Sequence, residues 1–87
     1  MAQSAFREPS LTMATQIVLE SHVSGAPHNW LDEASGQSGT VTPIRTFKTK
    51  TGVFCRDYEV SKNGGNTDLH RACRSQGLWI EIKALQG

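Results

Sequence analysis

The fold is decided by one stretch of sequence, CRDYEVSKNGGNTDLHRACR, which covers residues 55–74. Its central residues, Asn63-Gly64-Gly65-Asn66, are typical of a tight hairpin turn, because glycine and asparagine readily adopt the positive φ values that such turns need. A reversal of the chain about Gly64 places Cys55 directly opposite Cys73. The same register pairs Asp57 with Arg71 and Tyr58 with His70, which are favourable cross-strand neighbours.

Two directly opposed cysteines on paired strands lie within reach of a disulfide bond, so we predict the bond Cys55–Cys73. A cross-link of this kind stabilises a domain too small to bury a large core, and it indicates an oxidising compartment.

Residues 1–9 show neither a basic region nor an apolar core, so no signal peptide is visible. Two interpretations stay open: the chain is cytosolic, or a leader was removed from it. The cysteine pair favours the second.

Outside the hairpin the sequence predicts one helix and further strands. Ser10 is a suitable N-cap for a short helix over residues 10–21, whose apolar residues recur at helical spacing. Residues 22–39 are rich in glycine, proline, asparagine, aspartate and serine and are expected to form a loop. We predict an α+β fold, a short N-terminal helix packed on a four-stranded antiparallel β-meander with one disulfide. The expected strands are residues 40–49, 53–61, 67–74 and 78–84.

Length and composition limit the classes of function. With 87 residues the chain forms one domain, which we place at residues 10–87 after a flexible N-terminal segment of residues 1–9. The net charge is +1 and the six aromatic residues (two Trp, one Tyr, three Phe) are spread along the chain, which argues against a nucleic-acid partner. The longest strongly apolar run is residues 17–19, so no transmembrane segment is expected.

The candidate binding residues lie mainly on the sheet face opposite the cysteines. Two guanidinium groups there, those of Arg56 and Arg74, could form a subsite for an anion, or they could lie over the sheet and stack on aromatic rings. Trp30 either fills a gap between helix and sheet or is an exposed recognition residue. Which face the helix covers stays open, because both faces carry apolar residues. The tentative binding residues are Trp30, Arg56, Tyr58, His70 and Arg74.

No pattern of residues predicts a catalytic centre, a metal site or a cofactor. His70 and Cys73 are three residues apart on a strand and therefore point to opposite faces, so they are not expected to share a metal ion or to act as a Cys–His pair. The expected disulfide would also consume the nucleophile. A small enzyme dependent on a thiol and a histidine is kept as an alternative that requires a free cysteine.

A series of short motifs runs in order through more than half of the chain. They are Trp30, Ser35-Gly36-Gln37-Ser38-Gly39-Thr40-Val41-Thr42-Pro43, Arg45-Thr46-Phe47, Gly52, Cys55-Arg56-Asp57-Tyr58-Glu59, Ala72-Cys73-Arg74 and Gly77-Leu78-Trp79. In this order and spacing, the sequence resembles the C-terminal domain of the bacterial 17 kDa surface antigen family, known from rickettsial outer-membrane lipoproteins and related proteobacterial proteins.

The resemblance implies a bacterial cell-envelope protein, in the periplasm or at the outer membrane or cell surface, with no assigned catalytic activity. It implies a protein partner and a role in protein–protein binding or structural support. Members commonly carry a lipoprotein leader and a glycine-zipper segment before this domain; neither is seen here, and both cysteines belong to the β-module. The alternative is a small accessory subunit or inhibitor of a larger envelope enzyme.

Overall fold

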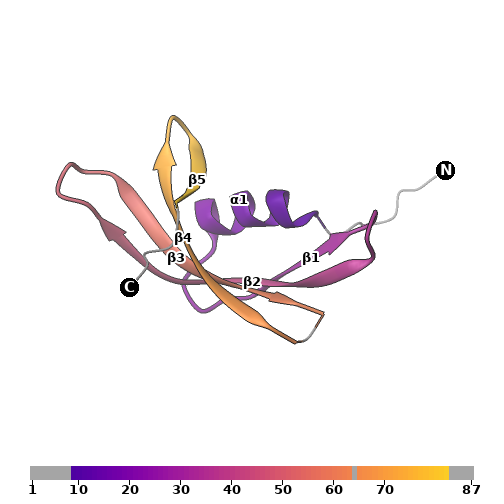
Figure 1. Cartoon of the computed structure of the whole chain (residues 1–87). Helices are drawn as coiled ribbons and strands as arrows, with labels where there is room; N and C mark the ends of the chain where they lie inside the picture. Colours follow the sequence, from indigo (N-terminus) through magenta and orange to yellow (C-terminus); the bar gives the residue numbers. More distant parts are fainter. Residues whose placement is uncertain (1–8, 64, 83–87) are drawn as a thin grey trace.

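The computed structural model describes residues 9–63 and 65–82. They form one helix and five strands, and Figure 1 shows the helix lying across one face of a twisted sheet. The expected flexible segment of residues 1–9 lies outside the described residues except for Pro9, as do residues 83–84 of the last expected strand. The elements are α1 (Leu11–Ser21), β1 (His28–Asp32), β2 (Gln37–Lys48), β3 (Phe54–Lys62), β4 (Thr67–Ser75) and β5 (Leu78–Ile82).

The sheet is an antiparallel meander in which each strand pairs with its neighbours in the sequence, in the order β1-β2-β3-β4-β5. The β3–β4 hairpin has the expected register, with Cys55 opposite Cys73 and Asp57 opposite Arg71. The two cysteines form a disulfide across a Cα–Cα distance of 4.0 Å. The predicted α+β class, the hairpin register and the disulfide are therefore confirmed.

The predicted number of strands is wrong, because residues 28–32 form β1 and not part of a loop. β1 pairs with the first part of β2 across a tight turn. The carboxylate of Asp32 accepts hydrogen bonds from the backbone N–H of Ala34 (3.1 Å) and the hydroxyl of Ser35 (2.9 Å), and Gly36 adopts a φ of 77°. The polar and glycine residues that predicted a loop build a hairpin turn instead.

Helix α1 begins where the sequence predicts it. The side chain of Ser10 accepts a hydrogen bond from the backbone N–H of Met13 (3.3 Å) and so caps the first turn. The helix packs its apolar side on the sheet face that carries Arg56 and Tyr58, which answers the question of which face is the core. The core cluster is Ala14, Val18, Leu19, Trp30, Val41, Tyr58, Val60, Ala72 and Trp79.

Both edges of the sheet form hydrogen bonds with the N-terminal part of the chain. The side-chain amide of Gln16 donates to the backbone carbonyl of Trp79 (2.6 Å) and accepts from the backbone N–H of the same residue (2.9 Å). At the opposite edge, the backbone N–H of Leu31 donates to the carbonyl of Pro9 (2.8 Å). The helix and its lead-in therefore tie together β1 and β5, the two outermost strands.

The second face of the sheet is not covered by the helix. Strands β4 and β5 expose apolar side chains there, because their register places Ile80 beside the disulfide and Ile82 beside Arg71. A two-layer fold buries one face of its sheet and leaves the other face to solvent or to a partner. The exposed apolar residues of β4 and β5 are Leu69, Leu78, Ile80 and Ile82.

Candidate functional site

The structure brings two of the predicted binding residues, Tyr58 and His70, together in a groove. The groove has a volume of about 300 Å³ and lies between the first half of α1 and the strands β3, β4 and β5. Its lining combines apolar side chains with hydroxyl, carboxyl, amino and imidazole groups. The lining residues are Leu11, Thr12, Thr15, Gln16, Tyr58, Val60, Lys62, Asp68, His70, Ala72, Trp79 and Glu81.

A hydrogen-bonded cluster forms the polar wall of this groove. The ring of His70 stacks on Tyr58 at 5.4 Å between centroids, and its Nδ1 lies 2.6 Å from Oε2 of Glu81. The hydroxyl of Tyr58 donates to Oε1 of the same carboxylate at 3.4 Å. Burial, reinforced by the nearby charge of Glu81, raises the pKa of Tyr58 well above its ordinary value. Tyr58 therefore stays a neutral hydrogen-bond donor over the physiological pH range.

The register of the sheet explains how these side chains meet. Tyr58 lies opposite His70 in the β3–β4 pair, and Glu81 lies opposite Ala72, two residues along β4 from His70. Diagonal neighbours on one face of a sheet are within reach of long side chains. Sequence reasoning missed Glu81 as a site residue. Extending the hairpin register through the Ser75-Gln76-Gly77 turn would have found it.

The two predicted arginines lie at a second recess, of about 470 Å³, on the other side of Trp79. Arg56 is only 7% exposed, and its Nη1 donates to the carbonyls of Val18 (3.3 Å) and Leu19 (2.9 Å). Its cation thus sits at the negative end of the helix dipole. Burial lowers the pKa of Arg56, and its Nε has no hydrogen-bond partner among the described residues.

Arg74 faces Glu20 of the helix across the same recess. Its Nε and Nη2 donate to the two carboxylate oxygens of Glu20 at 3.0 and 3.2 Å, and the indole Nε1 of Trp79 donates to Oε1 at 2.9 Å. Hydrogen bonds from Arg74 and then from Trp79 hold the pKa of Glu20 below its ordinary value. The recess is lined by Leu19, Glu20, Thr46, Phe54, Arg56, Arg74 and Trp79.

Trp30 lies apart from both hollows, in the core between the helix and the sheet. Its side chain is almost fully buried, and its indole N–H has no hydrogen-bond partner among the described residues. The four other predicted binding residues thus lie on one face of the sheet, Tyr58 and His70 in the groove and Arg56 and Arg74 at the second recess. Trp30 packs in the core beneath that face.

Both cysteines of the chain are joined in the disulfide, so neither sulfur is available as a nucleophile in this oxidised form. Within residues 9–63 and 65–82, no group of three or more His, Cys, Asp and Glu side chains is arranged to hold a metal ion. None of the helical segments in that part of the chain is long and apolar enough to span a bilayer.

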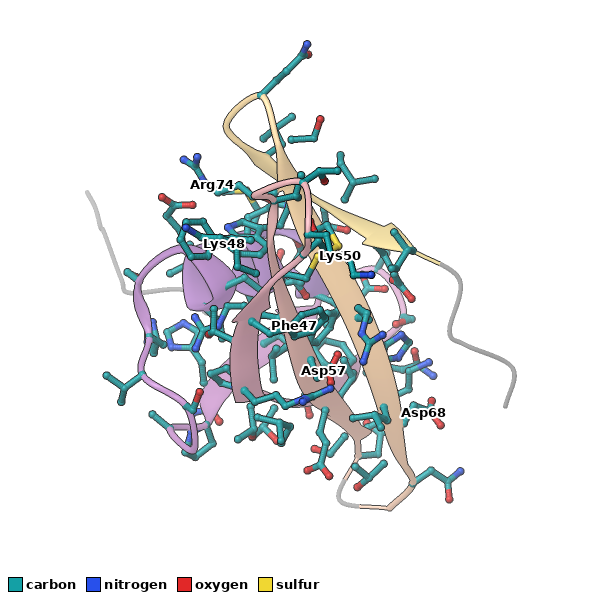
Figure 2. All side chains as sticks on the ribbon, turned by 90° about the vertical axis from the view of Figure 1, so that its left-hand side faces the viewer. Phe47, Lys48, Lys50, Asp57, Asp68 and Arg74 are labelled. Atoms are coloured by element: carbon teal, nitrogen blue, oxygen red, sulfur yellow. A yellow bond between two sulfur atoms is a disulfide. The ribbon has the colours of Figure 1, made fainter. Side chains whose placement is uncertain are left out.

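The uncovered face carries a charged cluster centred on Asp57, which is buried between two arginines. Its carboxylate accepts hydrogen bonds from Nε of Arg71 (2.6 Å) and Nε of Arg45 (2.9 Å). The same two guanidinium groups lie 4.8 and 5.0 Å from the ring centroid of Phe47, and Figure 2 shows Phe47 beside Asp57 on this face. Hydrogen bonding from Arg71, assisted by Arg45, holds the pKa of Asp57 below its ordinary value, against the effect of burial.

Replacing this carboxylate is expected to change how stability depends on pH. Asp57→Asn should lower the free energy of unfolding at neutral pH by about 2 kcal/mol, because the amide loses charge-assisted bonds to two arginines. In the unmodified protein this contribution is complete above the ordinary aspartate pKa of about 3.9 and disappears as the pH falls through the lower pKa of the folded state. Urea unfolding measured from neutral to acidic pH should therefore show a flatter profile for Asp57→Asn.

The matched control is Glu59→Gln, which removes an exposed carboxylate from the same face of the same strand. It should leave both the stability at neutral pH and the acid profile nearly unchanged, since exposed charges contribute little. An Asp57→Asn profile parallel to that of the unmodified protein would contradict the assignment of acid sensitivity to Asp57.

Comparison with known families matches residues 17–79 to the 17 kDa outer membrane surface antigen. Three relatives illustrate the similarity, all described as 17 kDa surface antigens. The protein of Rickettsia felis is 35% identical over 71 residues, and that of Rickettsia conorii is 37% identical over 71 residues; each alignment covers 77% of this chain and 45% of the relative. The protein of Rickettsia bellii is 39% identical over 46 residues, which cover 53% of this chain and 29% of the relative.

The chain therefore spans less than half the length of the curated relatives that it matches. No solved structure matches it.

Proposed function

The chain belongs to the 17 kDa outer membrane surface antigen family, and from this membership we propose that it is a non-enzymatic protein of the bacterial cell envelope that acts by binding another protein. Its place would be the periplasm or the outer membrane and cell surface. Two observations support this placement: the description of the family, and a disulfide of the kind that persists in oxidising compartments.

The observation that carries the binding role is the groove beside α1. Its volume, about 300 Å³, suits one or two side chains of a partner, and it combines an apolar floor with a few fixed polar groups. Val60 and Ala72 form part of the floor. Glu81 holds the imidazole of His70 through Nδ1, which leaves Nε2 as the ring atom that can bond a partner. An apolar hollow with a fixed polar group at its wall is a suitable pocket for a central side chain of a partner protein.

A photo-crosslinking experiment in the native host tests this proposal. A photoreactive amino acid at Thr12, on the rim of the groove, should give a discrete adduct with a partner protein. The same residue at Met13, which is exposed one position along the helix and does not line the groove, should give none. His70→Ala should lower the adduct yield from position 12 about tenfold, the effect of losing one central contact.

His22→Ala is the matched control for this substitution, because His22 lies beyond the end of α1 and outside the groove. It should leave the adduct unchanged. Equal adducts from positions 12 and 13, or a yield that does not respond to His70→Ala, would contradict binding through the groove.

A further inference from the structure

Charge is unevenly distributed over this nearly neutral chain. The meander places the β2–β3 turn and the β4–β5 turn at the same end of the sheet, and neither residues 44–56 nor residues 69–80 contain an acidic residue. Figure 2 shows Lys48, Lys50 and Arg74 gathered toward this end, while Asp68 lies toward the opposite end. We name this end of the molecule the basic end; it comprises Lys48, Lys50, Val53, Phe54, Arg56, Arg74 and Leu78.

The positive charge of the basic end is only partly compensated. Arg74 is paired with Glu20, and Arg56 is bonded to helix carbonyls and not to a carboxylate. Neither Lys48 nor Lys50 forms an ion pair with any residue that the structure describes. The basic end therefore carries an excess of positive charge, which attracts an anionic surface and does so more strongly at low salt.

Apolar side chains project from the same end. Phe54 is 49% exposed although it is aromatic, and Leu78 in the neighbouring turn region is 56% exposed. The Nζ of Lys48 lies 5.0 Å from the ring centroid of Phe54, so a cation and an aromatic ring stand side by side. Lysines next to exposed aromatic and aliphatic side chains are typical of surfaces that bind at the headgroup level of a membrane.

The arginine recess opens beside Phe54 and offers a place for one anionic group. Phe54 lines it beside Arg56 and Arg74, so it contains two guanidiniums against the single carboxylate of Glu20. Guanidinium groups bind phosphate oxygens through charge-assisted hydrogen bonds. A soluble polyanion would use the cations alone, whereas the exposed Phe54 and Leu78 favour a lipid surface.

We propose that the basic end docks on an anionic lipid membrane, with Phe54 and Leu78 entering the headgroup layer and the arginine recess receiving a lipid phosphate. Lys48 and Lys50 supply the attraction to the charged surface. This inference does not depend on the protein-binding groove, which lies on the other side of Trp79.

Flotation of the whole chain with lipid vesicles tests the proposal. The protein should float with vesicles of phosphatidylcholine and phosphatidylglycerol, remain free with phosphatidylcholine alone, and bind less as salt is added. Lys50→Gln should weaken binding about fivefold and the double variant Lys48→Gln/Lys50→Gln about 25-fold, because each basic residue near an anionic surface contributes a factor of this size. Lys62→Gln, at the opposite end of β3, should have no effect.

The apolar contribution is tested separately. Phe54→Ser should weaken vesicle binding about tenfold, since it removes an aromatic side chain from the headgroup layer. Leu69→Ser, which removes an exposed apolar side chain near the opposite end of the sheet, is the control and should bind normally. Thermal melting confirms that each variant is folded.

Three results would overturn the proposal. One is equal binding to both kinds of vesicle. Another is a short DNA duplex that binds as tightly as the anionic vesicles and does not respond to Phe54→Ser, which would indicate a soluble polyanion as the ligand. The third is complete release from vesicles by inorganic phosphate at unchanged ionic strength, which would leave a phosphate site without membrane docking. The crosslinking result at position 12 is independent of all three.

Discussion

Replacing both cysteines, as Cys55→Ala/Cys73→Ala, is expected to lower the free energy of unfolding by about 3 kcal/mol, because the bond closes a loop between residues 18 apart in the sequence. For a domain of this size, such a loss corresponds to a fall of roughly 12–24 °C in Tm. The loss is a large fraction of the total stability, because a domain this small buries a small core and is only marginally stable. Differential scanning calorimetry on the oxidised protein and the variant measures it.

The wild type kept reduced, without alkylation, and the variant should have similar melting temperatures, since each lacks the cross-link but keeps the same strands. Alanine is preferred to serine, because Cys55 is buried and a hydroxyl there would add a desolvation cost of its own. An oxidised protein that melts no higher than the variant would show that the β3–β4 hairpin does not need its cross-link.

Gly39→Ala is expected to destabilise the fold by about 3 kcal/mol or more, at the upper end of the cost of overpacking. A methyl group at this position would overlap the backbone oxygen of Ser61 and would lie 2.7 Å from its carbonyl carbon. Backbone atoms of a central strand cannot move aside as the end of a long side chain can. The change would also strain the contact between Thr40 and Ser61, whose hydroxyls are 2.8 Å apart.

Gly65→Ala provides the matched control in the neighbouring turn. There a methyl group would meet only the carbonyl oxygen of Lys62, at the ordinary contact distance of 3.6 Å. Its effect on the free energy of unfolding, measured with urea, should be within about 0.5 kcal/mol. If both alanine variants unfold at the same urea concentration, the close approach of β2 to β3 at Gly39 is not what requires glycine there.

The β3–β4 hairpin was predictable because three signals agreed on one register. The Asn-Gly-Gly-Asn turn placed the reversal, and the cysteines and the pair Asp57–Arg71 then faced each other. A shift by one residue would have moved every side chain to the other face. Helix α1 was predictable for a similar reason, since Ser10 and the apolar spacing mark the same start.

Strand β1 escaped prediction because its local sequence argues for a loop. Only Trp30 and Leu31 in this segment favour a strand, and proline and glycine surround them. Tertiary pairing with β2 overrides this weak local preference. The sequence shows that Gly36 can adopt a positive φ in a turn. It does not show that this turn joins β2 to a preceding strand, β1.

The hydrogen-bond partners of Arg56 and Arg74 could not be predicted from the sequence, for a different reason. Arg56 and Arg74 share a face in the predicted sheet, and the structure keeps them together at one recess. Their immediate partners, however, are carbonyls and a carboxylate of α1, and the crossing of the helix over the sheet is set by packing. The basic end likewise arises only when the meander brings two separate turns to the same end of the sheet, so no run of basic residues in the sequence indicates it.

The hydrogen bonds between Gln16 and Trp79 have a consequence for self-assembly. An amide side chain offers one donor and one acceptor, the same pair that a peptide group of an incoming strand would present. Exposed strand edges otherwise template the pairing of neighbouring molecules into growing sheets. A strand that pairs with β5 at Trp79 must first break both of these bonds, so the side chain of Gln16 opposes polymerisation through this part of the edge.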